Sequence, residues 1–152
     1  MKIKIELDDK LTEDEVVIKC REISGDIQRI QNAIANVTLQ DKNMVFWKNG
    51  KEYFLPLHSI LFFETNGKEI DCHTENDIFN VKHKLYELEE MLPTNFVRVS
   101  KSTILNIDKI YSIDKNIISS SLVQFHKTHK QVYISRYYYK AVREKLERSR
   151  VI

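Results

Sequence analysis

Polar and basic side chains gather at three places where an apolar run of the sequence ends. These are the stretches 64–68, 96–106 and 133–138. The middle stretch is unusual for a core strand, because an apolar–basic alternation leads into Ser100 and Lys101 before apolar residues return. Lysine, arginine and hydroxyl side chains can offer hydrogen bonds and positive charge to an anionic surface. The chemistry that these stretches suggest is non-covalent recognition.

A catalytic set is not evident in the sequence. With only three glycines, the chain contains no glycine-rich phosphate-binding loop. His126 and His129 have a weak metal-ligand spacing in an expected hairpin turn, without a nearby cysteine or paired carboxylate, and we interpret them as solvent-facing. Cys20 and Cys72 have no metal or redox spacing and are interpreted as small buried hydrophobes. We therefore expect no enzyme, no cofactor and no metal.

The charge of the chain is unevenly distributed, although its net value is only +2. Residues 1–40 carry an acidic excess, whereas residues 126–150 contain eight lysines and arginines against Glu144 and Glu147. This asymmetry favours an anionic partner for the C-terminal part. Neither a signal peptide nor an apolar run of the ~20 residues needed to cross a bilayer is present. We expect a cytoplasmic protein that does not insert into a membrane.

Residues 1–40 are predicted to form a strand–strand–helix segment. Residues 2–7 alternate strictly between polar and apolar, and residues 15–22 do so less cleanly. Ser24 is a plausible N-cap for an amphipathic helix that presents a stripe of isoleucines and Val37. Because the segment is too small to bury this stripe by itself, it should dock on the rest of the chain or pair two copies.

Residues 41–152 are predicted to form one α+β domain dominated by strands. Asn49-Gly50 is a strong hairpin signal, and residues 75–77 indicate a second hairpin. A helix is expected over 82–92, stopped by Pro93, and a final basic helix from a Ser135 cap to about Leu146. The expected strands cover 44–48, 52–55, 58–64, 70–74, 78–81, 96–99, 110–114, 122–125 and 131–134.

The chain resembles the LytTR family of DNA-binding domains, found in many bacterial transcription regulators, over residues ~44–147. The pattern is specific as a combination rather than in any one piece. It comprises Ile60 to Glu64, Asn66 to Lys68, Leu85 to Pro93, the spaced set Phe96, Arg98, Ser102 and Asn106, then Ile107 to Ile110, and finally Ser135-Arg136.

The resemblance implies a multi-stranded β scaffold that sends loops into successive major grooves of double-stranded DNA. Carried over residue by residue, the principal DNA contacts fall on Lys68, Lys101 and Arg136. Secondary candidates are Asn66, Ser100, Ser102 and Lys140. A homodimer, at least on DNA, and an operator with paired repeats are expected. The alternative is a protein-interaction or scaffold module that kept this fold without DNA binding.

The arginine and lysine candidates differ in what they can do. A guanidinium matches the two major-groove acceptors of guanine, so Arg136 is assigned to base recognition. Lys68 and Lys101 can reach a base or neutralise a phosphate. Arg98 is interpreted as a structural partner of Glu64, and the tyrosines of 137–139 as core and capping residues.

Two departures from the family pattern bear on the mechanism. Many members have a histidine where this chain has Ser100, so a contact there would be shorter and neutral. Many also carry an upstream receiver domain, and only about forty residues precede the domain here, so a phosphorylation switch is not expected.

Overall fold

The structure is a computed structural model that describes residues 1–40 and 43–149. Within these residues there are three α-helices and ten strands, and no strand or helix precedes Gly25. The helices are α1 (Gly25–Gln40), α2 (Leu85–Met91) and α3 (Arg136–Ser149). The strands are β1 (Asn43–Lys48), β2 (Lys51–Pro56), β3 (Ile60–Asn66), β4 (Glu69–Thr74), β5 (Ile78–Val81), β6 (Phe96–Ser100), β7 (Thr103–Asn106), β8 (Ile110–Asp114), β9 (Ser121–Phe125) and β10 (Gln131–Ile134).

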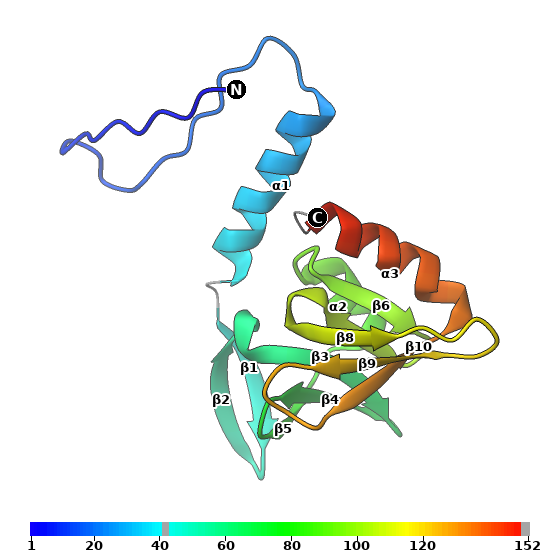
Figure 1. Ribbon diagram of the computed structural model, residues 1–152. Helices are drawn as coiled ribbons and strands as arrows, with labels where there is room; N and C mark the ends of the chain where they lie inside the picture. The colour runs from blue at the N-terminus through cyan, green and yellow to red at the C-terminus, as the bar shows by residue number, and fades with distance from the viewer. Residues whose placement is uncertain (41–42, 150–152) are drawn as a thin grey trace.

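The described strands form two antiparallel sheets (Figure 1). The larger has seven strands in the order β2-β1-β5-β4-β3-β7-β6, and the smaller has three in the order β10-β9-β8. Helix α3 follows β10 and contacts β6, so it joins the small sheet to one edge of the large one. This β-dominated α+β architecture confirms the predicted fold class.

Two hydrophobic cores lie on the opposite faces of the large sheet. One contains Phe46, Phe79 and the α2 residue Leu88, and the other lies between the large sheet, the small sheet and α3. Strand β3 supplies both, because Ile60 and Phe63 belong to the first core and Leu61 and Phe62 to the second. A register shift between Ile60 and Phe62 accompanies this run of four buried residues.

Most elements predicted for residues 43–149 are present. The Asn49-Gly50 hairpin forms with φ of 52° and 75°, the positive values that a type I′ turn requires. The second predicted hairpin is the β4–β5 pair. Strand β7 was not predicted, and the helix expected from residue 82 begins at Leu85. Ser135 precedes α3 as expected, but its buried hydroxyl has no hydrogen-bond partner, so it does not cap the helix through its side chain.

The N-terminal segment differs from the prediction. Helix α1 forms, and the Ser24 hydroxyl accepts a hydrogen bond from the Ile27 amide at 3.4 Å, but residues 2–7 and 15–22 form no strands. An alternating pattern needs a paired neighbour to complete its backbone hydrogen bonds, and the described chain provides none in register. The domain boundary predicted at residue 41 falls on residues outside the described part, and it remains a prediction.

The two cysteines behave differently. Cys72 is fully buried in the first core, where burial raises the pKa of its thiol well above the usual range, as expected for a structural residue. Cys20 is exposed, contrary to the prediction, because the strand on which its burial depended does not form. Among the described helices none is long and apolar enough to cross a bilayer.

Candidate nucleic-acid interface

Three chain segments that are distant in sequence meet at one edge of the molecule. The Thr65 amide near the end of β3 donates to the Ser102 carbonyl at 2.9 Å, which joins the β3–β4 and β6–β7 turns. The Ser135 amide donates to the Val99 carbonyl at 2.9 Å, which joins the start of α3 to the end of β6. The β10–α3 junction lies at the right of Figure 1. The three predicted contact stretches therefore share one edge.

A hollow of about 250 Å³ marks the place where these segments meet. Its lining is mostly hydroxyl-bearing, with one carboxylate from Glu64. The lining residues are Glu64, Ser100, Ser102, Thr103, Ser120, Gln131, Val132, Tyr133 and Ser135. The lining of the hollow has an acid and no cation, so the hollow itself does not attract an anion. An anionic partner would therefore be held by the basic residues on the adjoining segments.

The first turn presents Lys68. Strands β3 and β4 pair as far as Asn66 and Glu69, and Gly67 between them has φ of 62°, in the left-handed region that favours glycine. Lys68 follows this glycine and is exposed. The Asn66 side-chain amide donates to the Asp71 carboxylate at 3.0 Å, so one of its two N–H donors is engaged internally.

The second turn carries Ser100, Lys101 and Ser102. Ser100 pairs with Thr103 across the β6–β7 hairpin, and its hydroxyl accepts a hydrogen bond from the Ser102 amide at 3.2 Å. The two serine hydroxyls lie 3.3 Å apart. Lys101 stands exposed at the tip of the turn.

Arg98 fixes the backbone of the second turn. Its Nε donates to the Ser100 carbonyl at 2.7 Å and its Nη2 donates to the Lys101 carbonyl. Its Nη1 pairs with the Glu89 carboxylate of α2 at 3.0 Å. The structural role predicted for Arg98 is therefore correct, but its predicted partner, Glu64, is wrong.

Glu64 instead lies beside His73, with 3.5 Å between the Glu64 Oε2 and His73 Nε2 atoms. The His73 ring stacks on Phe62 with centroids 4.2 Å apart, and its side chain is 12% exposed. Burial, assisted by the positive charge of Lys130, lowers the pKa of His73 to about 4. The imidazole is therefore neutral at physiological pH.

The third segment is the start of α3. Arg136 and Lys140 are both exposed and lie one helical turn apart, so they share a face of the helix. Tyr138 and Tyr139 pack against the second core as predicted. Tyr137 is 87% exposed, which contradicts its prediction as a core residue, because the first turn of α3 presents it to solvent.

Tyr133 is a residue of this edge that the sequence interpretation missed. It lines the hollow and is 60% exposed. The signal was present in the alternation of residues 131–134, in which Val132 and Ile134 are buried and the other two face outward. Together with Tyr137, it adds an aromatic hydroxyl to each side of the β10–α3 junction.

The side chains of Lys68, Lys101, Arg136 and Lys140 make no ion pair with any other residue in the described ranges. Other cations of the domain are engaged, such as Lys48 with Asp77 and Arg143 with Glu147. An unpaired cation near a sheet edge can meet an anionic partner without breaking an internal contact.

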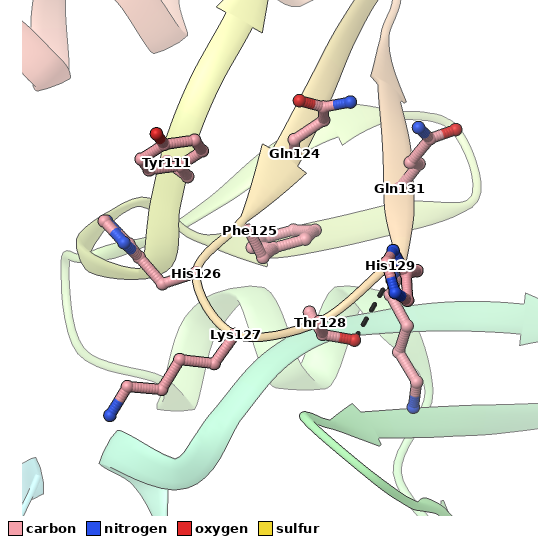
Figure 2. Close-up of a pocket in the computed structure, with 9 residues that line it drawn as sticks. Tyr111, Gln124, Phe125, His126, Lys127, Thr128, His129 and Gln131 are labelled. Carbon is pink, nitrogen blue, oxygen red and sulfur yellow. Dashed lines mark hydrogen bonds between the residues drawn. The ribbon is translucent and has the colours of Figure 1, made fainter.

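The predicted His126–His129 turn connects β9 to β10 (Figure 2). It lies at the end of β10 opposite the α3 junction, and therefore away from the shared edge. It borders a hollow of about 490 Å³, and the His126 ring meets the edge of Tyr111 with centroids 4.9 Å apart. Both histidines are exposed, as predicted. Within residues 1–40 and 43–149 no group of three metal-ligating side chains is assembled.

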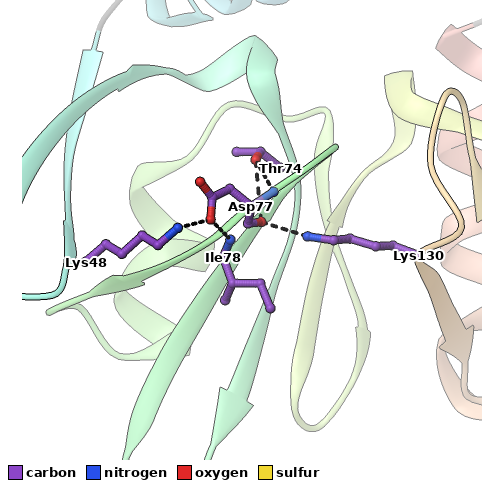
Figure 3. Close-up of polar contacts among 5 residues, drawn as sticks. All are labelled: Lys48, Thr74, Asp77, Ile78 and Lys130. Carbon is purple, nitrogen blue, oxygen red and sulfur yellow. Dashed lines mark hydrogen bonds and ion pairs between the residues drawn. The ribbon is translucent and has the colours of Figure 1, made fainter.

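Lys130, at the end of this turn, ties the small sheet to the large one (Figure 3). Its Nζ donates to the Asp77 carbonyl at 2.7 Å, while Lys48 of β1 pairs with the Asp77 carboxylate. The hydrogen bonds from Lys48 and the Ile78 amide lower the pKa of Asp77. This connection helps to fix the small sheet, and with it the β10–α3 junction, against the strands that carry the other two turns.

Comparisons with known proteins identify the family and the fold. A family model described as the LytTr DNA-binding domain matches residues 50–147. A protein of Staphylococcus aureus strain MSSA476, described as an uncharacterized HTH-type transcriptional regulator, is 30% identical over 149 residues, which are 96% of this chain and 98% of that protein. A counterpart in strain NCTC 8325 is 29% identical over the same length. The LytTr DNA-binding domain of a putative methyl-accepting/DNA response regulator from Bacillus cereus has the same fold, with a TM-score of 0.64 and 23% identity over 69% of this chain and 96% of that one.

Proposed function

The chain belongs to the LytTR family of DNA-binding domains, and from this membership we propose that it is a transcription regulator that binds specific sequences of double-stranded DNA. It acts by binding and not by catalysis, and as a bacterial regulator it works in the cytoplasm. The observation that carries the proposal is that the two turns with Lys68 and Lys101 and the start of α3 with Arg136 meet at one edge.

The major groove is read by loops in this proposal. Helices α2 and α3 are separated along the chain by five strands, so among the described residues they do not form the consecutive helix pair of a helix-turn-helix. The β3–β4 and β6–β7 turns project from a sheet whose register is fixed on both sides of β3. A rigid sheet edge is suited to hold turns at a constant spacing along a duplex.

Each basic residue has a distinct role in the proposed complex. Arg136 donates to the two acceptors of a guanine, a contact worth ~1–3 kcal/mol of discrimination between bases. Lys68 and Lys101 neutralise phosphates and set affinity, and Lys140 adds a further phosphate contact on the same helix face. Ser100, Ser102 and Asn66 supply neutral hydrogen bonds, and Tyr133 and Tyr137 direct hydroxyl groups to the sugar–phosphate backbone.

The proposal is tested by selecting bound duplexes from random DNA at moderate salt and then measuring affinities by fluorescence anisotropy. Arg136→Ala should lose ~1–3 kcal/mol on the selected duplex and little on a scrambled one. Lys101→Ala should weaken both duplexes and reduce the slope of log K against log salt by about one unit. Lys127→Ala removes another exposed lysine, from the β9–β10 turn, and serves as the matched control.

Two results would overturn the proposal. A selection that recovers no common sequence, together with no mobility shift at low salt, would leave a protein-interaction module of the same fold. Equal losses for Lys127→Ala and Lys101→Ala would place the DNA elsewhere on the domain.

A further inference from the structure

The first arm of the N-terminal segment, residues 2–8, exposes apolar side chains that find no partner. Ile3, Ile5 and Leu7 are 90%, 85% and 98% exposed. They alternate with Lys2, Lys4, Glu6 and Asp8, which is the pattern of a strand with one apolar and one charged face. An alternating segment of this kind is stable only when a second strand completes its hydrogen bonds and its apolar face is covered.

The first arm runs beside a second arm, residues 15–20 (Figure 1). A hollow of about 460 Å³ between them is lined by Lys2, Lys4 and Glu6 of the first arm and by Glu15, Val17 and Lys19 of the second. The even residues of one arm and the odd residues of the other thus share a face. The alternation places Ile3, Ile5 and Leu7 of the first arm on the opposite face, together with Val16, Ile18 and Cys20 of the second, whereas Val17 lies on the charged face.

Helix α1 covers only part of this apolar face. Val16, Ile18 and Cys20 of the second arm line a hollow together with Ile27 and Ile34 of α1. The stripe residues Ile27, Ile30 and Ile34 are accordingly half-buried. The apolar residues of the first arm remain uncovered.

We propose that the first arm pairs antiparallel with the same arm of a second copy of this chain, centred on Ile5. In this register Lys4 lies opposite the partner's Glu6, and Lys2 lies opposite the partner's Asp8. On the other face Ile3 lies opposite the partner's Leu7. Two-fold symmetry repeats each of these pairs, so every charged residue meets an opposite charge.

The charges of the arm select this register over its neighbours. Centring the pair on Lys4 places two lysines opposite each other, and centring it on Glu6 places two glutamates opposite each other. A shift by one residue brings apolar side chains opposite charged ones. Lys4 and Glu6 already form an ion pair within one chain, so both side chains lie on the same face and within reach of each other.

The arrangement joins the first arms of two copies into one antiparallel ribbon, with the second arm of each copy beside it and α1 beside the second arm. It deepens the proposed function, because two joined copies would present two DNA-binding domains to paired repeats. The pairing itself does not depend on DNA, so it is tested in the absence of DNA.

The test is sedimentation velocity of the full-length protein over a range of concentrations. Wild type should form dimers, and Lys4→Glu or Glu6→Lys alone should raise the dimer dissociation constant at least about tenfold, since each change turns two attractive pairs into repulsive ones. The double variant Lys4→Glu/Glu6→Lys should return to the wild-type value. Lys10→Glu makes the same charge change outside the paired register and should leave the constant unchanged.

A mixing experiment gives the most specific result. Equimolar Lys4→Glu and Glu6→Lys chains, each weakly dimeric alone, should form a heterodimer of wild-type strength. A wild-type chain that stays monomeric at every concentration would overturn the pairing. Dimers that resist both single charge changes but dissociate with Ile5→Lys would overturn the register. Unchanged DNA binding by Arg136→Ala and Lys101→Ala in a protein that still dimerises would instead count against the proposed function and leave the pairing intact.

Discussion

Arg98 should control DNA affinity without contacting DNA. Its guanidinium holds the Ser100 and Lys101 carbonyls and pairs with Glu89, and its side chain is 19% exposed. Arg98→Met keeps the apolar stem and removes all three contacts. Hydrogen bonds to charged groups contribute a net ~1.5–3 kcal/mol each. Because Lys101 and Glu89 are exposed and water can replace the lost contacts, we expect the free energy of unfolding to fall by only roughly 1–3 kcal/mol in total.

The effect on binding follows from the population of the ordered β6–β7 turn. If the turn of the variant is in its binding conformation for about one molecule in ten, the apparent Kd rises about tenfold, or ~1.4 kcal/mol. Anisotropy on the selected duplex measures this change, and urea unfolding shows that the variant is folded at the assay temperature. Glu89→Gln keeps both carbonyl contacts and should retain most of the affinity.

The salt dependence separates positioning from contact. If Arg98 acts only through the turn, the slope of log K against log salt stays at its wild-type value, whereas a lost phosphate contact would reduce it by about one unit. Wild-type affinity in a folded Arg98→Met protein would refute the assignment of Arg98 as a positioning residue.

Three further predictions concern the scaffold. Asn106 is buried, and its side chain accepts from the Asn95 amide at 2.9 Å and donates to the Ile60 carbonyl at 3.0 Å. Asn106→Ala should therefore lower the free energy of unfolding, measured in urea, by ~2–4 kcal/mol, and a loss below ~1 kcal/mol would contradict a structural role for these hydrogen bonds. The pKa of His73 is about 4 in the folded protein against 6.5 in the unfolded chain, so between these pH values the unfolded chain binds a proton that the folded protein does not. The free energy of unfolding should therefore decline by roughly 3 kcal/mol as the pH falls from 6.5 to 4, and this decline should be absent in His73→Phe. Lys130→Met should speed amide exchange in the β9–β10 turn and leave the β1–β2 hairpin unchanged, whereas equal acceleration in both would contradict a local tether.

The sequence allowed the domain and its site to be predicted wherever a local signal was strong. Asn49-Gly50 fixed one hairpin, and the spaced set from Phe96 to Asn106 located the second turn of the site. Strand β7 was missed because all four of its residues are buried, so no alternation marks it. The partner of Arg98 is contributed by α2, and nothing local in the sequence distinguishes Glu89 from Glu64.

The N-terminal segment shows the limit of periodicity as a predictor. Residues 2–7 alternate as a strand does, yet a strand exists only when another strand satisfies its backbone. Pattern alone predicts the potential to pair and leaves the partner unspecified. The exposure of Tyr137 has a similar origin, since an aromatic run at a helix start gives no indication of which ring turns toward the core.

Site-specific photo-crosslinking to the selected duplex tests the central claim most directly. A crosslinking residue is placed in turn at Lys68, Lys101, Arg136 and, as a control, Lys127, and the attached nucleotides are mapped. Our account predicts crosslinks from the first three positions within one continuous stretch of the duplex and none from the control. Crosslinks from the control position, or from only one of the three predicted positions, would contradict a single shared edge for DNA.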